Sequence, residues 1–397
     1  MTQQPLRVLM ISPEAVPFAK TGGLADVAGA LPLALKKLGL EVCLLLPLYG
    51  MVRQSGVELT RVAADLMVSF ASQPLSFDVY RAEVDGLPCY FVERDEFYDR
   101  RQLYGTPKGD YFDNLERYVF LAKTILPVCQ ELGLAPEVLH CHDWQSALIP
   151  VYLREVWQDE EVFAKTVSVF TIHNLAYQGL FRKEKFPLLD LDASLFSIDG
   201  LEFYDQINFM KGGILWADAV NTVSRQYSQE IQTEQFGCGL DGVLRTRADV
   251  LTGIVNGVDY AVWNPSTDPL IAANYNPDDL KGKAKNKKAL IAEYGLDPAF
   301  KEAPLLGMVS RLADQKGFDL LAAILPELMA ENLMLVILGT GDKKYHDLLI
   351  AAAQQYPGRL GVKIAFDNRI AHLIEATYAF SRTTSPPLRV ANRRRTS

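Results

Sequence analysis

The stretch "LRVLMIS" (Leu6–Ser12) is followed, after a short gap, by "KTGGLADVAGALP" (Lys20–Pro32). The first stretch is an apolar run of the kind that forms a buried parallel strand. The second has a lysine and two glycines ahead of a helical pattern that carries an aspartate near its start. A strand, a glycine loop and a helix make up the first half of a βαβ unit. These two stretches therefore predict an α/β protein.

The glycine loop has two interpretations. Gly22 and Gly23 allow backbone amides to approach a ligand, and the N-terminus of the following helix favours an anion such as a phosphate. Lys20 would add a positive charge beside it. The chain has neither a G-x-G-x-x-G motif nor a G-x-x-x-x-G-K-[ST] motif, so the loop could equally be a plain turn beside a solvated lysine.

Further apolar runs alternate with longer helical patterns. The runs are "EVCLLLP" (Glu41–Pro47), "VLHCHD" (Val138–Asp143), "TVSVFTIHN" (Thr166–Asn174), "DAVNTVS" (Asp218–Ser224) and "DVLTGIVNG" (Asp249–Gly257). Regular alternation of this kind predicts a doubly wound parallel sheet with helices on its faces.

A change in composition marks a second domain. Residues 256–279 are rich in Asn, Pro and Asp, and the lysine run "KGKAKNKK" (Lys281–Lys288) follows them. We expect a domain entry here and not the interior of an element. A second βα series comes next, with "APLLGMVSRL", "LMLVILGTGD" and "GVKIAFD". We predict a first domain over 5–255, a partial second domain over 256–376 and a separate tail over 377–397.

Composition excludes several classes of function. The 397 residues carry a net charge of −8, which argues against a nucleic-acid-binding surface. The five cysteines form no C-x-x-C pair and are typical of a reduced protein interior. No apolar run reaches membrane-spanning length, and the first strand starts too early for a signal peptide. We therefore expect a cytoplasmic protein with neither membrane nor nucleic-acid partners.

Two cations follow the first strand of the second domain. In "SRLADQKG" (Ser310–Gly317), Arg311 and Lys316 lie five positions apart in a loop that ends in glycine. A guanidinium fork and an ammonium that converge on one site suit a diphosphate leaving group. The alternative is two solvated surface cations.

Histidines follow two strands of the first domain. "HCHDWQSAL" (His140–Leu148) places two histidines and Asp143 together, which invites a metal site, but no further Asp-His pair follows at hydrolase spacing. We therefore predict no metal. His173 and Asn174 end the next strand and could bond a polar ligand, although a satisfied core histidine is the commoner case.

Taken together, these blocks resemble one family. "KTGGLADVAGALP", "HCHDWQSAL", "FTIHNLAYQG", "FMKGGILWADAVNTVS", "GIVNGVDYAVWNP", "SRLADQKGFDLL" and "LGTGD" occur in the order found in bacterial glycogen synthases and plant starch synthases. The resemblance covers about residues 5–376. It implies a GT-B fold, in which two Rossmann-like domains face each other across a cleft. It also implies metal-independent, retaining transfer of glucose from ADP-glucose to the non-reducing end of an α-1,4-glucan such as glycogen, with no cofactor.

The resemblance also implies roles for individual residues. Lys20, Gly22 and Gly23 would contact the donor, and Arg311 and Lys316 would neutralise its diphosphate. Further contacts would come from both domains: His173 at the transferred glucose, Asn174 beside it, Asp143 near glucose and acceptor, and Asn256, Gly339 and Gly341 on the nucleotide side.

The end of the chain departs from the family pattern. After "AHLIEA" the family continues with a strand and a glutamate-containing segment, whereas this chain changes to a tail with five arginines and no acidic residue. The change looks like truncation or a frame shift. An alternative function is therefore a catalytically impaired remnant that still binds glucan. A third, a different GT-B transferase related to sucrose synthase, is disfavoured by the "KTGGLADV" block.

Overall fold

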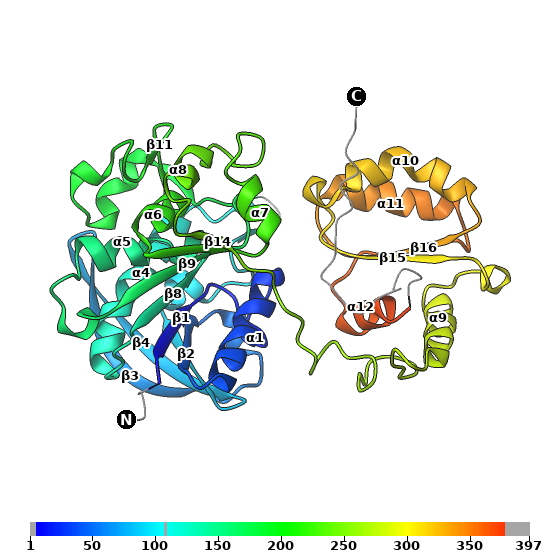
Figure 1. Cartoon of the computed structure of the whole chain (residues 1–397), viewed down its shortest axis with the longest axis horizontal. Helices are drawn as coiled ribbons and strands as arrows, with labels where there is room; N and C mark the ends of the chain where they lie inside the picture. The colour runs from blue at the N-terminus through cyan, green and yellow to red at the C-terminus, as the bar shows by residue number, and fades with distance from the viewer. Residues whose placement is uncertain (1–4, 107–108, 378–397) are drawn as a thin grey trace. The chain divides into compact units, whose positions relative to one another are not determined.

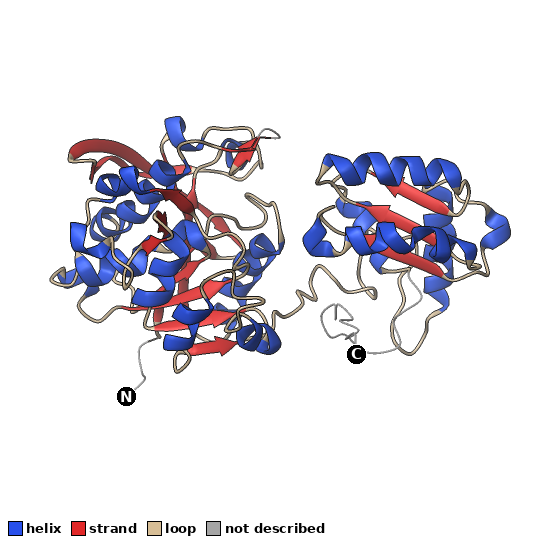
Figure 2. Ribbon diagram, turned by 90° about the horizontal axis from the view of Figure 1, so that it is seen from above, coloured by secondary structure: helices blue, strands red, loops and turns tan. Residues whose placement is uncertain are grey.

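The computed structural model describes residues 5–106 and 109–377. The chain divides into two compact units, Met1–Asn256 and Gly257–Ser397 (Figure 1). Each unit contains a parallel β-sheet with helices packed on it (Figure 2). The tail that we predicted over 377–397 lies outside the described residues apart from Thr377.

The first unit is built on a nine-stranded sheet with the order β14-β13-β9-β8-β1-β2-β5-β4-β3. Its strands are β1 (Arg7–Ile11), β2 (Glu41–Pro47), β3 (Thr60–Phe70), β4 (Gln73–Val84), β5 (Leu87–Glu93), β8 (Val138–His142), β9 (Val167–Ile172), β13 (Ala219–Thr222) and β14 (Leu251–Gly253). The strands from β14 to β5 run parallel, and β4 and β3 extend the sheet in antiparallel fashion.

Helices connect these strands. They are α1 (Gly23–Lys37), α2 (Gly50–Arg53), α3 (Asp95–Tyr98), α4 (Asn114–Glu131), α5 (Leu148–Glu155), α6 (Phe209–Trp216), α7 (Arg225–Glu230) and α8 (Asp241–Thr246). Two small antiparallel sheets complete the unit: β6 (Gly105–Thr106) with β7 (Gly109–Asp110), and β10 (Leu180–Arg182) with β12 (Gln206–Asn208) and β11 (Glu202–Phe203).

The central strand β1 explains why the sheet forms where the sequence predicts it. Val8, Leu9, Met10 and Ile11 are all buried, because β1 is covered by strands on both edges and by protein on both faces. The chain passes from β1 to β2 on one side and returns to β8 on the other. The gap between the carboxyl ends of β1 and β8 is therefore a topological switch point, the place where open α/β sheets bind ligands.

The second unit has a three-stranded parallel sheet with the order β15-β16-β17. The strands are β15 (Leu305–Val309), β16 (Met334–Leu338) and β17 (Leu360–Lys363), and the helices are α9 (Lys281–Glu293), α10 (Phe318–Ala330), α11 (Lys343–Gln355) and α12 (Asn368–Glu375). Figure 1 shows α10 and α11 on one face of this sheet and α12 on the other.

Alternation along β16 decides which helices cover which face. Met334, Val336 and Leu338 pack into a core with residues of α9 and α12, whereas Leu335 and Ile337 pack into a second core with α10 and α11. Successive strand residues point to opposite faces, so a strand that is apolar at every position needs a core on each side. The predicted α/β fold is confirmed. The sheet of the second unit is parallel throughout, whereas the antiparallel strands β4 and β3, which the sequence did not predict, make the sheet of the first unit mixed.

The prediction for the lysine run was wrong. Residues 281–288 form the first two turns of α9 and not a loop. Asn286 is buried in this stretch, where its side chain bonds both the backbone N–H and the carbonyl of Ala273. The lysines therefore sit on a helix whose place is set by a buried amide and by Leu290 and Ile291, a tertiary contact that composition does not reveal.

Candidate active site

The residues predicted for the first unit lie at the switch-point edge of its sheet. Asp143 directly follows β8, and His173 directly follows β9, its neighbour in the sheet. The loop with Lys20, Gly22 and Gly23 follows β1, the neighbour of β8 on the other side. Parallel pairing brings these three strand ends together, although the glycine loop lies more than a hundred residues before Asp143 in the sequence.

Asp143 joins the ends of β8 and β9. Its Oδ1 accepts hydrogen bonds from the backbone N–H of His173 (2.7 Å) and of Asn174 (3.4 Å). Its own backbone has φ 56° and ψ −178°, a conformation that is essentially confined to glycine and costs about 1–3 kcal/mol in other residues. A strained aspartate at a strand end is typical of a functional site, where contacts with the surrounding structure hold the backbone in an unfavourable conformation.

Burial also changes the acidity of this carboxyl. Removal from water raises the pKa of Asp143 to about 7, with a smaller contribution from the negative charge of Glu14. The hydrogen bonds from His173 and Asn174 act in the opposite direction. The group can therefore exchange a proton near neutral pH.

Three histidines form a row beside Asp143. His142 Nδ1 lies 2.9 Å from His173 Nε2, and His140 Nε2 lies 2.7 Å from Thr171 Oγ1. The ring of His142 lies 4.3 Å from that of His140 and 5.2 Å from that of His173, measured between centroids. Burial lowers the pKa of His140 to about 4 and that of His173 to about 3, so these rings are neutral at pH 7.

Glu14 holds the glycine loop, a role that the sequence analysis missed. Its buried carboxylate accepts hydrogen bonds from the Thr21 N–H (2.5 Å), the Thr21 hydroxyl (2.5 Å), the Gly22 N–H (3.3 Å) and the Tyr104 hydroxyl (2.6 Å). Four donors on one buried anion fix the loop against the sheet edge. The available signal was an acidic residue placed three positions after Ile11, the last residue of β1.

Lys20 pairs with Asp26 in the first turn of α1, with Nζ and Oδ1 2.6 Å apart. Both side chains are partly exposed, and an ion pair of this kind contributes at most about 1 kcal/mol. The lysine can therefore exchange Asp26 for an anionic ligand at little cost. Helix α1 begins at Gly23, and its N-cap residue Gly22 supplies no side-chain cap to the first N–H groups.

The two glycines of this loop are not required by the protein's own packing. A Cβ at Gly22 or Gly23 would have no heavy atom within 4 Å, and Gly22 has an extended backbone that any residue adopts. Open space above backbone amides is what a ligand-binding loop needs. Packing within the chain therefore gives no reason for glycine at these two positions.

In the second unit, the loops after β15 and β16 pack against each other. Leu312 and Gly341 form a parallel bridge, and a Cβ at Gly339 would stand 1.9 Å from the carbonyl oxygen of Ser310. A Cβ at Gly341 would stand 2.3 Å from the carbonyl oxygen of Leu312. Both glycines therefore have a structural reason: they let the two strand-end loops touch backbone to backbone.

The predicted cations lie on these loops. Arg311 is exposed and its guanidinium approaches the Gln315 side chain at 3.4 Å. Lys316 is exposed at the end of a short 3₁₀ turn, Asp314–Lys316, just before Gly317, whose φ is +75°. Asn256, at the boundary of the two units, is also exposed.

Comparison with known proteins identifies the family. A family model described as "Starch synthase catalytic domain" matches residues 7–246. A glycogen synthase from Koribacter versatilis is 46% identical over 373 residues, which cover 94% of this chain and 76% of the relative. The chain belongs to the glycogen synthase and starch synthase family. A glycogen synthase from Thermotoga maritima is 42% identical over 377 residues, with the same coverage of 94% and 76%.

A solved structure agrees with this membership of the glucosyltransferase family. The catalytic domain of starch synthase IV from Arabidopsis thaliana, bound to ADP and acarbose, superposes with a TM-score of 0.87 at 30% identity. The match covers 94% of this chain and 77% of that domain. The resemblance stated from the sequence motifs is confirmed.

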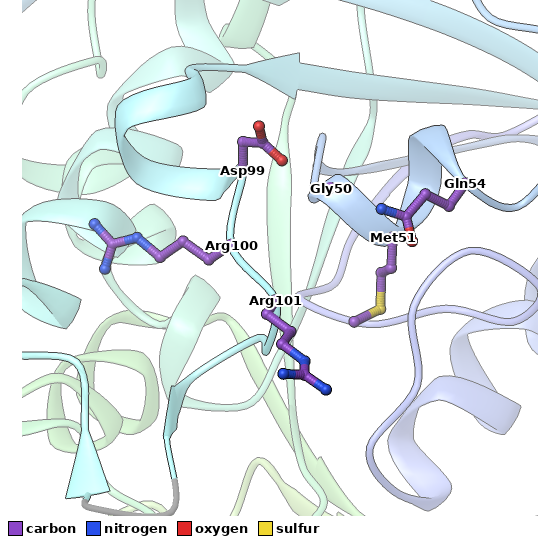
Figure 3. A pocket seen from close by; sticks show the side chains of 6 residues that line it. All are labelled: Gly50, Met51, Gln54, Asp99, Arg100 and Arg101. Carbon is purple, nitrogen blue, oxygen red and sulfur yellow. The ribbon is translucent and has the colours of Figure 1, made fainter.

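Two cavities of the first unit lie apart from the residues that the family resemblance singles out. One of about 260 Å³ is lined by Gly50, Met51, Gln54, Asp99, Arg100 and Arg101, and Figure 3 shows its two arginine side chains extending in different directions. Arg100 reaches Asp113, with Nη1 2.7 Å from Oδ1. The other, of about 350 Å³, lies between β3, α4 and α5.

Two other features of the described chain bear on the predicted chemistry. Within 5–106 and 109–377, no three histidine, cysteine, aspartate or glutamate side chains are grouped so as to hold a metal ion. In the same residues, every helix is too short or too polar to pass through a bilayer.

The contrast between Gly22 and Gly339 predicts different effects of the same substitution on stability. Gly22→Ala should leave the melting temperature unchanged, because its methyl group enters open space. It should weaken donor binding, because the methyl group would occupy the space that the loop leaves for a ligand. Gly339→Ala should lower the melting temperature by several degrees, because its methyl group meets the Ser310 backbone. Thermal unfolding followed by circular dichroism checks both. A melting temperature that falls equally in the two variants would contradict this assignment.

Proposed function

We propose that this chain transfers glucose from ADP-glucose to the non-reducing end of an α-1,4-glucan, with retention of configuration at the transferred carbon. One observation carries the proposal. The switch-point edge of the first unit combines an open glycine loop and an uncapped helix N-terminus with the Asp143 and His173 cluster. The first suits an anionic diphosphate, and the second suits a hydroxyl-rich sugar.

In the reaction, the bond from C1 of glucose to the diphosphate oxygen breaks, and a bond from C1 to the acceptor hydroxyl oxygen forms. The hydroxyl proton leaves with the diphosphate or to solvent. Negative charge grows on the diphosphate as its bond breaks, so cations placed there stabilise the transition state more than the ground state. We assign this part to Arg311 and Lys316, with Lys20 contributing from the glycine loop.

The sugar and nucleotide contacts are assigned as follows. His173 bonds a hydroxyl of the transferred glucose, with Asn174 beside it, and Asp143 lies near glucose and acceptor. Asn256 contacts the nucleotide side of the donor. Gly339 and Gly341 act on the same side of the donor, by shaping the loop that follows β16. The ADP and acarbose bound to the Arabidopsis relative support a nucleotide diphosphate donor and a glucan acceptor for this chain.

The test is incorporation of labelled glucose into glycogen by the purified chain, with ADP-glucose and UDP-glucose compared at equal concentration. We expect incorporation that is faster from ADP-glucose and unaffected by a metal chelator. No incorporation by a folded chain would refute the proposal. Sedimentation of the chain with glycogen in that case would favour the alternative, a protein that binds glucan without transfer.

A further inference from the structure

His142, the last residue of β8, is fully buried and contacts His173 directly. Its Nδ1 and the Nε2 of His173 are 2.9 Å apart, so one of these nitrogens carries the hydrogen and the other accepts it. The distance between the two nitrogens does not by itself show which of them carries the hydrogen. The choice decides which nitrogen of His173 is left as a donor for a ligand.

The other nitrogen of His142 settles the choice. Nε2 of His142 is buried and finds no hydrogen-bond partner among the described residues. A buried N–H without an acceptor is rarer than a buried acceptor without a donor. The hydrogen of His142 is therefore on Nδ1, and His142 donates to Nε2 of His173.

This assignment fixes the state of His173. The low pKa of its ring, about 3, keeps it neutral, and its Nε2 accepts the bond from His142. A neutral imidazole carries one hydrogen, which must then be on Nδ1. His173 is only partly buried, and within the described residues its Nδ1 makes no hydrogen bond.

We propose that His142 is a positioning residue that fixes the tautomer of His173, so that Nδ1–H of His173 donates to a hydroxyl oxygen of the sugar. The identity of the ligand rests on the function proposed above, whereas the tautomer rests on the contacts within this chain. The bond spans segments 31 residues apart. It exists because β8 and β9 pair in parallel with His142 opposite Thr171.

The direct test is nuclear magnetic resonance of the chain labelled with ¹⁵N in its five histidines. Two-bond ¹H–¹⁵N correlations distinguish the two neutral tautomers, and single substitutions assign the signals. We expect His173 with its hydrogen on Nδ1. A His173 signal with the hydrogen on Nε2 would overturn the proposal, whatever the activity of the chain.

Three variants separate positioning from packing. His142→Asn keeps an amide N–H near the place of Nδ1, so His173 should keep its tautomer. His142→Leu removes the donor, so His173 should show a mixture of tautomers. His140→Leu removes another buried ring, one that bonds Thr171 instead, so the His173 signal should not change. The same change in His140→Leu as in His142→Leu would overturn the proposal.

Activity provides a second readout. Loss of one positioned hydrogen bond should lower kcat/KM for ADP-glucose by about 10- to 100-fold in His142→Leu. His142→Asn should stay within about threefold of the parent, since its bond to His173 is retained. Equal losses in the two variants would overturn the positioning role. A parent chain without any transfer would refute the proposed function, and the tautomer would still be decided by the spectra.

Discussion

Lys316→Ala should lower the rate of glucose transfer by about 100- to 1000-fold, the usual cost of removing one group that stabilises charge in a transition state. Lys316 is exposed on a strand-end loop of the second unit, and no acidic side chain among the described residues pairs with it. Its charge is therefore available to a ligand. The measurement is kcat for labelled glucose transfer from ADP-glucose to glycogen, with the melting temperature followed in parallel.

Lys343→Ala is the matched control for this prediction. Lys343 is also an exposed lysine of the second unit, but its Nζ pairs with Asp347 Oδ2 at 2.5 Å on the surface of α11. Its removal should change kcat by less than about twofold, since exposed pairs of this kind contribute little. A similar loss in both variants would mean that the general positive charge of the unit matters and not a specific contact of Lys316.

Asp143→Asn should make the protein more stable at pH 8 while it impairs transfer. The carboxyl has a raised pKa of about 7 in the folded chain, against 3.8 for an ordinary aspartate. Well below pH 3.8 it is protonated in both states. As the pH rises towards 7, the unfolded chain releases this proton and the folded chain retains it, so folding loses stability, by about 1.4 kcal/mol for each pH unit.

The amide of asparagine does not ionise, and its oxygen can still accept from the N–H of His173. The variant should therefore exceed the parent by about 2–4 kcal/mol in the free energy of unfolding at pH 8, and this difference should fall below about 1 kcal/mol near pH 4. Urea unfolding of both proteins at the two pH values measures this. A difference that is the same at pH 4 and pH 8 would show that the gain does not come from the buried charge.

Asp192→Asn provides a control of opposite sign. Asp192 is exposed, and hydrogen bonds from Ser194 hold the pKa of its carboxyl below the ordinary value. Its charge therefore stabilises folding above the ordinary aspartate pKa, and this stabilisation is lost as the pH falls through the lowered value. Asp192→Asn should destabilise the protein slightly at pH 8 and not at pH 2.

Sequence alone placed most of the parallel strands and the residues that follow them, but it did not predict β3, β4 and β5. The buried runs of β1, β2, β8, β9, β15 and β16 are continuous apolar segments, and this local signal is strong because a parallel strand is covered on both faces. Asp143 and His173 directly follow strands, as predicted, and Arg311 and Lys316 lie on the segment between β15 and α10. The functional roles of these residues stay predictions.

What the sequence could not determine depends on contacts between distant segments. Glu14 was missed because its partners are the loop that follows it and Tyr104, 90 positions away. The lysine run of α9 was misassigned because Asn286 and Ala273 meet only in the folded unit.

The strain at Asp143 and the bond from His142 to His173 were likewise decided by tertiary structure. Both depend on the register in which β8 pairs with β9, and a shift of one residue would point every side chain of a strand to the other face. Local periodicity therefore determines where strands and their end residues occur, and only the pairing of strands decides which of those residues meet.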